Sequence, residues 1–472
     1  MATATTEPVR LPPGPRLPKT VQGLALLVAR HGSIAALARR YGSPFTVNVP
    51  VFGRMVVVSD PELVKELFST SRELIGRPTN NLGDVLGEGS TFSLDGEELQ
   101  ERRKLLLPPF HGKGMRSYER ITEEEVLREV ATWPEGREFE TLEPMMRISL
   151  NTILRAVFGA EGPALDELRT LMPVAVTFGS RIALMPAKVR RDFGPWSPGG
   201  RFAQYRRRMD ALIESLIADA RADPAFEERS DVLTLLLRAR YENGEPISDA
   251  HIADELLTLL VAGHETTSAQ LSWAVERIRR HPRLLSRLTD EVDAGGSELR
   301  QATIAETQRT RPVLTAALRR TKKRIQLGEW VIPEDTSVMA SLQLAMAAEQ
   351  SFPDSESFNP DRFVGGSPNS FAWIPFGGGM MRCIGAGFAS MEMDVVLRTL
   401  LREFHFEPTD APGERRHSRG VAIAPGRGGR AVVYRRKIRA SSTADSVSAA
   451  TTPVESVHQR ASSETVVRRR SC

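Results

Sequence analysis

The chain has 472 residues, of which 41% are hydrophobic and 26% charged, so it has the length for a large core and the composition of a globular protein. Its two cysteines, Cys383 and Cys472, exclude a scaffold built on disulfides and are typical of a reducing compartment, so we expect a cytoplasmic location. The 63 basic and 59 acidic residues leave a formal net charge of +4, which gives no indication of nucleic-acid binding. We find neither a run of about 18 apolar residues nor the form of a signal peptide, so we expect no membrane span.

One large domain is predicted between two terminal segments. Residues 1–20 form a proline-rich arm, in which 11–15 are stiff and extended. Residues 21–436 contain no low-complexity linker and no repeat, so we interpret them as a single domain. Residues 437–472 are rich in Ser, Thr and Ala, and we expect them to be disordered.

The predicted elements are mostly helical. Short strands are expected at 45–49 and 54–58, near the N-terminus. The strongest helical pattern covers 249–280, with Ser248 as a plausible N-cap. Because 256–262 are apolar on nearly every face, this helix should run buried through the core. Near the C-terminus, the runs 421–423 and 431–434 flank a glycine-rich turn and predict a hairpin. The fold class is therefore mainly α with small β-sheets.

The buried helix contains an unusual polar segment. Glu265 and Thr266 are costly in an apolar helix unless they form hydrogen bonds or take part in chemistry. One interpretation is a helix bend, because Thr can bond back to a carbonyl one turn earlier and Gly263 makes bending easier. His264 is expected to be a satisfied histidine rather than a metal ligand.

Further along, Glu306 and Arg309 are three residues apart on one expected helix, so their side chains can pair. Arg362 supplies another cation downstream. The spacing alone is common by chance.

Cys383 lies in a glycine-rich loop, 376–385, directly before the helical run 387–397. The positive end of the helix dipole and the loop N–H groups should favour its thiolate, which is the metal-binding form. The alternative is a structural cysteine on an ordinary loop.

This loop resembles the haem-ligand loop of the cytochrome P-450 superfamily, Phe-Gly-x-Gly-x-Arg-x-Cys-x-Gly, and the resemblance covers about residues 11–436. It implies the superfamily fold, with a long buried helix over the haem. It also implies haem b as cofactor, with the thiolate of Cys383 as axial ligand to the iron. Phe376, Gly377, Gly379 and Gly385 would then lie beside the cofactor.

The same resemblance extends to the other motifs. The buried helix is similar to the distal motif of the superfamily, in which Thr266 would hydrogen-bond the activated dioxygen and Glu265 would relay protons toward it. Glu306, Arg309 and Arg362 are similar to a Glu-x-x-Arg helix with its partner arginine, and we expect them to be structural.

The haem propionates need cationic partners, and here the pattern is incomplete. Arg103 and Arg319 match propionate-binding positions of relatives. Leu99 and Met381 stand where relatives have a histidine and an arginine, so two donors are missing. Arg382, Arg319 or water could fill the gap, and the sequence leaves these alternatives open.

The resemblance implies a haem-thiolate monooxygenase that hydroxylates or epoxidises a lipophilic small molecule, with dioxygen as the oxidant. No flavin or iron–sulfur motif is evident, so electrons should come from a ferredoxin and a ferredoxin reductase. Segments 80–94 and 173–200 should cover the substrate pocket, and the basic residues of the second could be either its rim or a solvated helix end. The alternatives are a peroxide-driven peroxygenase and a haem-binding sensor that has lost turnover.

Overall fold

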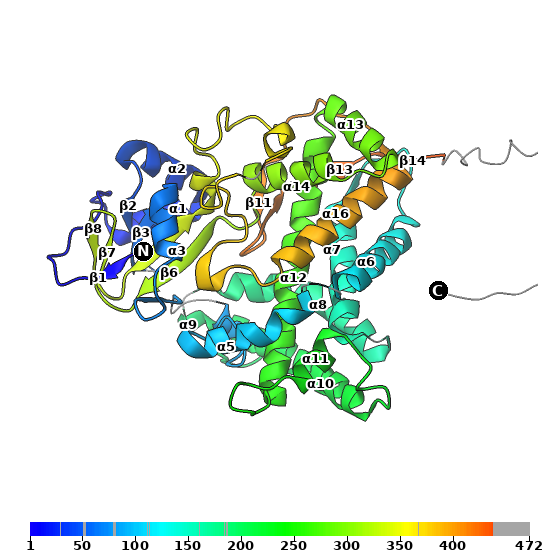
Figure 1. Cartoon of the computed structure of the whole chain (residues 1–472), viewed down its shortest axis with the longest axis horizontal. Helices are drawn as coiled ribbons and strands as arrows, with labels where there is room; N and C mark the ends of the chain where they lie inside the picture. The colour runs from blue at the N-terminus through cyan, green and yellow to red at the C-terminus, as the bar shows by residue number, and fades with distance from the viewer. Residues whose placement is uncertain are drawn as a thin grey trace, which may run out of the picture. The chain divides into compact units, whose positions relative to one another are not determined.

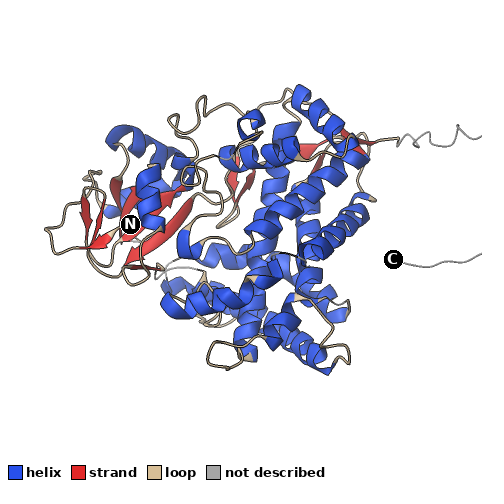
Figure 2. Ribbon diagram, in the orientation of Figure 1, coloured by secondary structure: helices blue, strands red, loops and turns tan. Residues whose placement is uncertain are grey.

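Helices dominate the described chain, and its strands are short (Figures 1 and 2). The computed structural model describes residues 1–28, 30–50, 53–78, 82–110, 112, 114–159, 161–183, 185, 187–366 and 368–437. Residues Met1–Arg435 form one compact unit. The predicted disordered tail lies outside the described residues, apart from Lys437. Among the described helices, none has both the length and the apolar character needed to cross a bilayer.

The helices group around a long central one. They are α1 (Lys19–Val28), α2 (Arg30–Tyr41), α3 (Pro61–Phe68), α4 (Gly83–Leu86), α5 (Gly96–Leu106), α6 (Gly114–Val130), α7 (Leu142–Phe158), α8 (Pro163–Ala183), α9 (Ala187–Arg190), α10 (Pro198–Ala222), α11 (Val232–Arg238), α12 (Asp249–Ile278), α13 (Pro282–Asp293), α14 (Glu298–Thr310), α15 (Leu342–Ala345) and α16 (Ala386–Glu403), with short 3-10 turns η1 (Pro108–Phe110), η2 (Pro360–Phe363) and η3 (Gly379–Met381).

The strands form one five-stranded sheet and four smaller ones. They are β1 (Thr3–Ala4), β2 (Phe45–Val49), β3 (Gly53–Val58), β4 (Ile75–Gly76), β5 (Phe139–Glu140), β6 (Ala316–Thr321), β7 (Ile325–Leu327), β8 (Trp330–Ile332), β9 (Ser337–Ser341), β10 (Phe404–Phe406), β11 (Arg416–Ser418), β12 (Ile423–Pro425), β13 (Arg430–Ala431) and β14 (Val433–Arg435).

The largest sheet has the order β2-β3-β9-β6-β4, in which only β3 and β9 run parallel. Val57 of β3 is fully buried and lies opposite Met339 of β9. The two strands expected near the N-terminus are therefore confirmed as β2 and β3. This sheet lies on the left in Figure 1 with α1, α2 and α3, away from α10 and α16.

The predicted C-terminal hairpin is wrong. Its two runs do not pair with each other: β12 pairs with β11, β13 with β5, and β14 with β10. The turn exists, since the Gly428 N–H donates to the Pro425 carbonyl at 3.2 Å. The strands nevertheless separate beyond it, because β12 pairs with β11, which lies just before it in the chain, while β13 and β14 pair with the more distant β5 and β10.

The proline-rich arm is attached to a small sheet. Thr3 lies opposite Gln326, so β1 adds a third strand to the β7–β8 pair. The Arg10 N–H also donates to the Val331 carbonyl at 3.0 Å. These backbone hydrogen bonds hold the extended arm against β7 and β8, a contact that its composition did not predict.

Helix α12 is the predicted buried helix, and its start is confirmed at the Ser248 cap, whose hydroxyl accepts from the His251 N–H at 3.3 Å. Its first half packs in an apolar core with α7, α8 and α10, through residues such as Leu256. Its second half enters another core, with α6, α13 and α16, through residues such as Val275. Helix α12 therefore joins the two cores, and the packing on both sides fixes the position of the polar segment at its centre, Glu265 and Thr266.

Candidate active site

The loop that carries Cys383 is fixed at both ends. The Cys383 N–H donates to the Phe376 carbonyl at 3.0 Å, and α16 begins three residues after the cysteine. In the first turn of α16, Phe388 is buried with its ring edge-on to Phe110 and Tyr118, at centroid distances of 6.0 and 5.4 Å. These contacts hold the loop against the core and fix the position of the thiol.

Two glycines of this loop need their special conformation. Gly377 and Gly379 have φ values of +66° and +62°, which side chains with a Cβ rarely adopt. A Cβ on Gly379 would also collide with the backbone carbonyl of Phe68. The loop therefore lies closer to α3 than any larger residue would allow.

The Cys383 side chain is exposed, yet the protein around it raises the pKa of its thiol through desolvation. The Gly385 N–H and the charges of Arg103 and Arg382 act in the opposite direction but do not prevail. Our expectation that the loop alone would favour the thiolate is therefore wrong, because burial outweighs the helix end and the nearby cations. Ligation to a metal would supply the missing stabilisation.

Near the centre of α12, the burial of the helix is interrupted. Ala262 is exposed and Thr266 is half-buried, although most of the helix is buried. The Thr266 hydroxyl donates to the Ala262 carbonyl at 2.8 Å, which is the predicted bond one turn back. Val261, next to this strip, and Ile384, next to Cys383, pack against the same apolar core.

Glu265 is buried but not isolated. Arg419, beyond β11, donates from Nε to a Glu265 carboxylate oxygen at 3.1 Å and from Nη2 to the Thr177 hydroxyl at 3.3 Å. Burial raises the pKa of Glu265, and Arg419 opposes that rise. His264 is fully buried, its Nδ1 lies 3.2 Å from the Leu260 carbonyl, and burial lowers its pKa to about 4, so it is a neutral core histidine. Its Nε2 is buried with no hydrogen-bond partner among the described residues, so the expectation of a satisfied side chain is wrong.

Three arginines in this part of the molecule influence one another electrostatically. Burial lowers the pKa of both Arg77 and Arg319 to about 10, and Arg77 lowers that of Arg319 further. Burial also lowers the pKa of Arg103, while the charge of Cys383 acts to raise it. Their hydrogen bonds go to backbone carbonyls: Arg77 to Leu94 at 2.8 Å, Arg103 to Arg382 at 2.8 Å, and Arg319 to Gly378 at 2.7 Å.

No carboxylate of the described residues forms an ion pair with these three arginines. Asp95, whose charge acts on Arg77, is paired with Lys322 at 2.8 Å. Buried charges without counter-charges are costly, so this group is suited to an anionic ligand with more than one negative charge. We did not predict Arg77 from the sequence, because it follows a two-residue strand and belongs to no motif.

The two positions that lack a donor differ in their surroundings. Leu99 is fully buried on α5, and Met381 is half-buried in η3. Arg382 is exposed, and its carbonyl accepts the bond from Arg103. The buried Leu99 side chain has no polar group to offer to a ligand.

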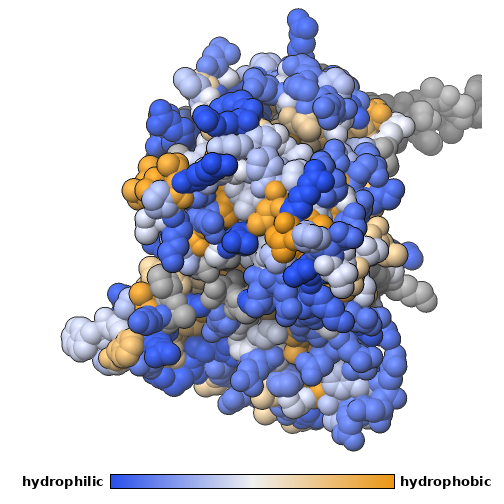
Figure 3. Space-filling view, turned by 90° about the vertical axis from the view of Figure 1, so that its left-hand side faces the viewer, coloured by the Kyte–Doolittle hydropathy of each residue, from blue (hydrophilic) through white to orange (hydrophobic). Residues whose placement is uncertain are grey.

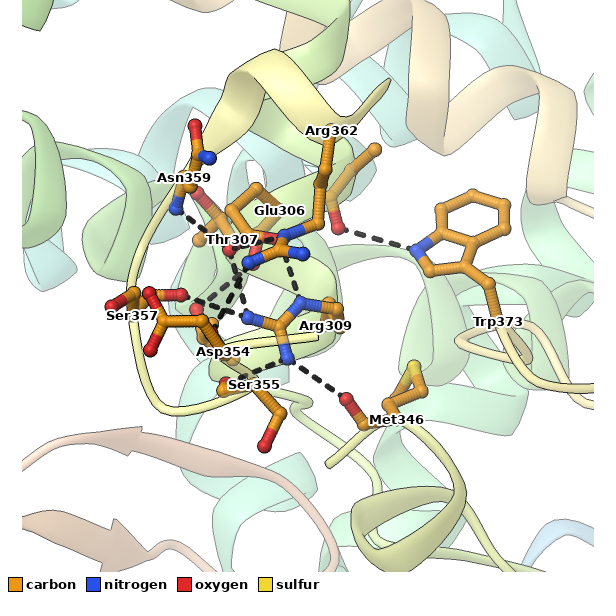
Figure 4. A network of polar contacts seen from close by, with 12 residues as sticks. Glu306, Thr307, Arg309, Met346, Asp354, Ser355, Ser357, Asn359, Arg362 and Trp373 are labelled. Carbon is orange, nitrogen blue, oxygen red and sulfur yellow. Dashed lines mark hydrogen bonds and ion pairs between the residues drawn. The ribbon is translucent and has the colours of Figure 1, made fainter. Parts of the chain in front are cut away.

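The predicted Glu306–Arg309 pair is fully formed and buried (Figure 4). Arg309 Nε donates to Glu306 Oε2 at 2.7 Å, and Arg362 Nε lies 3.4 Å from Oε1. Oε1 also accepts from the Asn359 N–H at 2.8 Å, while Arg309 Nη1 donates to the Met346 carbonyl at 2.9 Å. The network joins α14 to the segment that leads toward the Cys383 loop.

A small apolar pocket lies between α4, α8, α10 and α12, with a cavity volume of about 20 Å³, room for little more than a water molecule. Among its lining residues Ser180 carries the single polar side chain. The others are Leu82, Val85, Leu86, Ala175, Val176, Gly179, Phe202, Met209, Leu257 and Val261. Cys383 is not part of the lining, so the pocket belongs to the α12 side of the site.

Known proteins identify this arrangement. The sequence profile of the family described as Cytochrome P-450 matches residues 12–428. The chain belongs to the cytochrome P-450 family. Proteins of Mycobacterium tuberculosis and Mycobacterium bovis with the provisional name cytochrome P-450 138 are 53% identical over 439 residues, 92% of this chain and 99% of theirs. Others, provisionally named cytochrome P-450 135B1, are 38% identical over 90% of this chain and 92% of theirs.

The fold of this cytochrome P-450 is also found among solved structures. Cyanobacterial CYP120A1 with retinoic acid bound has a TM-score of 0.80 and 22% identity, covering 91% of this chain and 100% of that one. The predicted fold class, mainly α with small β-sheets, is thereby confirmed, as is the family inferred from the loop and helix motifs.

Members of this family carry haem b with a cysteine thiolate as axial ligand, so this cytochrome P-450 is a haem-thiolate oxidoreductase of the monooxygenase class. The residues present fit that cofactor. Cys383 offers an accessible thiol, and Arg77, Arg103 and Arg319 offer unpaired positive charge to the two propionates. Haem therefore explains both the accessible cysteine and the uncompensated arginines.

Proposed function

We propose that this cytochrome P-450 hydroxylates or epoxidises a lipophilic small molecule, using dioxygen and two electrons delivered by other proteins. The net reaction consumes dioxygen, two electrons and two protons, inserts one oxygen atom into a C–H or C=C bond, and releases the other as water. When bound, haem supplies the oxygen chemistry. The observation that carries the proposal is the buried Glu265 beside Thr266 in an otherwise apolar helix, because a peroxide-driven enzyme would need little proton delivery.

Cys383 is proposed as the axial ligand, held by its bond to Phe376 and by the helix that follows it. The glycines of its loop, Gly377, Gly379 and Gly385, would let the backbone lie close to the flat cofactor. Arg103 and Arg319 are proposed to hold the propionates, as the sequence resemblance implies. Arg77 joins them because it is half-buried, its pKa is lowered mainly by desolvation, and it forms no ion pair with a carboxylate among the described residues.

Replacing Arg77 with Leu should speed haem loss about tenfold, because one charge-assisted hydrogen bond contributes about 1.5–3 kcal/mol. Haem transfer to excess apomyoglobin measures the rate directly, without any assay of activity. Arg77→Lys should restore much of the retention, and Arg54→Leu, at an exposed site on β3, should leave the rate unchanged. Equal rates for wild type and Arg77→Leu would contradict the assignment.

Proton handling is assigned to two neighbouring side chains. The Thr266 hydroxyl donates to the Ala262 carbonyl, so its lone pairs remain able to accept a hydrogen bond on the exposed side of the helix. Glu265 is buried and desolvation raises its pKa, so its carboxyl group takes up a proton more readily than an exposed glutamate would and can pass it on. Arg419 holds this carboxyl in place.

The substrate is proposed to lie against the apolar lining of this pocket, whose walls would have to move apart to admit it. The lining favours hydrocarbon and offers little to a charged group, apart from the hydroxyl of Ser180. Steroid-like, terpene-like and fatty acyl compounds share this character, and the lining does not select among them. An optical titration with a lipid and steroid panel would identify binders by the change of spin state they induce.

We propose that a ferredoxin and a ferredoxin reductase deliver the electrons in the cytoplasm. The ferredoxin would be acidic and would approach the Cys383 side of the molecule. Lys104 and Arg382 are exposed there, and Lys104 is paired with Glu242 at 2.6 Å. Arg102, on the same helix as Lys104, is buried against Tyr241 and Glu255 and cannot contact a partner.

Electron transfer from an acidic ferredoxin should slow as salt rises, because screening acts within about 10 Å at 0.1 M ionic strength. Arg382→Glu should weaken the salt dependence and reduce the rate at low salt. Arg39→Glu, an equal charge change on α2, is the control and should behave as wild type. A rate independent of salt, or equal behaviour of the two variants, would rule out this docking surface.

The reaction class is tested by labelled oxygen. Once a binder is found, turnover with its redox partners under ¹⁸O₂ should place label in the product. If the product instead takes up label from ¹⁸O-labelled hydrogen peroxide, with no dioxygen needed, the peroxygenase alternative is favoured. Binding without any product, with electrons still reaching the iron, would favour a sensor.

A further inference from the structure

Two arginines lie side by side where α14 and β11 meet. Arg311 directly follows α14, and Arg416 is the first residue of β11. Both donate to the Thr310 carbonyl, Arg311 from Nη1 at 2.9 Å and Arg416 from Nη2 at 3.0 Å. Because both bonds go to one oxygen atom, the two guanidinium groups lie close together beside the end of α14 (Figure 1). We call Arg311 and Arg416 the arginine pair.

The buried carboxylate whose charge acts on Arg311 is already occupied by other groups. Glu276, near the end of α12, accepts from Arg277 Nη2 and from Arg280 Nε, both at 2.7 Å. It also accepts from the Glu414 N–H at 2.9 Å. Two arginines and a backbone N–H therefore use the oxygens of this single carboxylate, and it forms no ion pair with Arg311.

The carboxylate of Glu414, two residues before β11, is engaged with the backbone. It accepts from the Arg427 N–H at 2.6 Å and from the Arg430 N–H at 3.0 Å. Glu414 therefore fixes the turn that follows β12 and does not neutralise a side chain. Among the described residues, neither member of the arginine pair has an ion-pair partner.

The arginine pair is half-buried, which makes its charge unlike that of an ordinary surface arginine. Exposed charge is common on this protein, whose face in Figure 3 is mostly hydrophilic. At the pair, desolvation lowers the pKa of both guanidinium groups, that of Arg311 to about 10. The Arg311 guanidinium lies over the Trp273 ring, 5.2–5.6 Å being typical of such a stack and 5.4 Å the distance to the centroid here. The ring orients Arg311 but supplies no counter-charge.

This group is separate from the arginines assigned to haem. The charges that act on Arg311 come from Arg277, Arg280, Arg416 and Glu276, and not from the arginines near Cys383. Arg277 is also about three turns beyond the polar segment of α12, roughly 16 Å along the axis at about 1.5 Å per residue. The pair is therefore suited to a second anionic ligand.

We propose that the arginine pair binds a diphosphate group, either inorganic or carried by a small organic molecule. Each guanidinium is a planar fork that can bond two oxygens of one phosphate group. Two unpaired forks side by side match two linked phosphate groups. A carboxylate ligand would supply one charge to two cations and would leave half of the positive charge unbalanced.

The test is calorimetric titration of the haem-loaded full chain with inorganic pyrophosphate at constant ionic strength. Wild type should bind one equivalent, and should bind phosphate less tightly because phosphate fills one fork. Arg311→Gln/Arg416→Gln should lower the affinity for pyrophosphate at least tenfold. Arg311→Lys/Arg416→Lys keeps both charges without the forks, so its affinity should lie between those of wild type and the Gln variant.

A matched control and a second ligand complete the experiment. Arg39→Gln/Arg54→Gln removes two exposed arginines of α2 and β3 and should bind pyrophosphate as wild type does. Tighter binding of ADP than of pyrophosphate would identify an organic diphosphate as the ligand, and the reverse an inorganic one. No saturable binding to wild type, or equal binding by wild type and Arg311→Gln/Arg416→Gln, would overturn the site.

The spectrum of the reduced, carbon monoxide-bound protein should be the same in all of these variants. It shows that each variant is folded and loaded with haem, so a loss of affinity reports on the arginine pair. Failure of the diphosphate site would therefore leave the haem assignment and the proposed reaction untouched.

Discussion

Replacing Glu306 with Ala is expected to lower the free energy of unfolding by about 3–5 kcal/mol, the range for removing one partner of a buried ion pair. Arg309 would keep its bonds to the Met346 and Ser355 carbonyls but lose both bonds to the carboxylate. Its uncompensated charge would then be buried under the segment that leads to the Cys383 loop. The midpoint of urea unfolding measures the loss, and the fraction of haem-loaded protein should fall with it.

Gln301→Ala is the matched control for Glu306. Gln301 is exposed on the same helix, so its removal should change the free energy of unfolding by less than about 0.5 kcal/mol. The double variant Glu306→Ala/Arg309→Ala should be less destabilised than the sum of the single changes, because the orphaned charge is gone. Additive losses would mean that the two side chains contribute independently.

Thr266→Ala should separate electron consumption from product formation. Its hydroxyl is available on the exposed side of α12, and positioned proton delivery typically contributes a factor of about 10²–10⁴ in rate. Without it, NAD(P)H consumption should continue while product falls at least tenfold and hydrogen peroxide accumulates. Substrate affinity, read from the spin-state titration, should stay the same.

Two control variants accompany Thr266→Ala. Thr266→Ser keeps the hydroxyl and should retain most of the coupling. Thr267→Ala changes the buried neighbour on the same helix and should preserve the coupling of NAD(P)H use to product. If Thr266→Ala forms product with wild-type coupling, the proton role of this residue is wrong.

Local patterns predicted the elements that depend on local physics. The long apolar run and its serine cap indicated α12, and short runs of strand-forming residues indicated β2 and β3. Three-residue spacing indicated the pair of Glu306 and Arg309, because a helix brings such residues together.

Long-range partners were not predictable in this way. The hairpin prediction failed because β12 pairs with the preceding β11, while β13 and β14 pair with β5 and β10 from earlier in the chain. Arg419 contacts Glu265 across 154 positions of the chain, and Arg77 follows a two-residue strand, so no spacing could indicate either. The pKa of Cys383 was misjudged for the same reason, since the sequence shows the helix end but not the surrounding atoms.

The absorption spectrum of the reduced, carbon monoxide-bound protein tests the central assignment most directly. If the thiolate of Cys383 is the axial ligand, freshly prepared wild type should show the far-red-shifted Soret band of a haem-thiolate protein. Cys383→Ser should lose that band, while Cys472→Ser, the other cysteine of the chain, should keep it. An unshifted band in wild type, or a shifted band that survives in Cys383→Ser, would contradict the account.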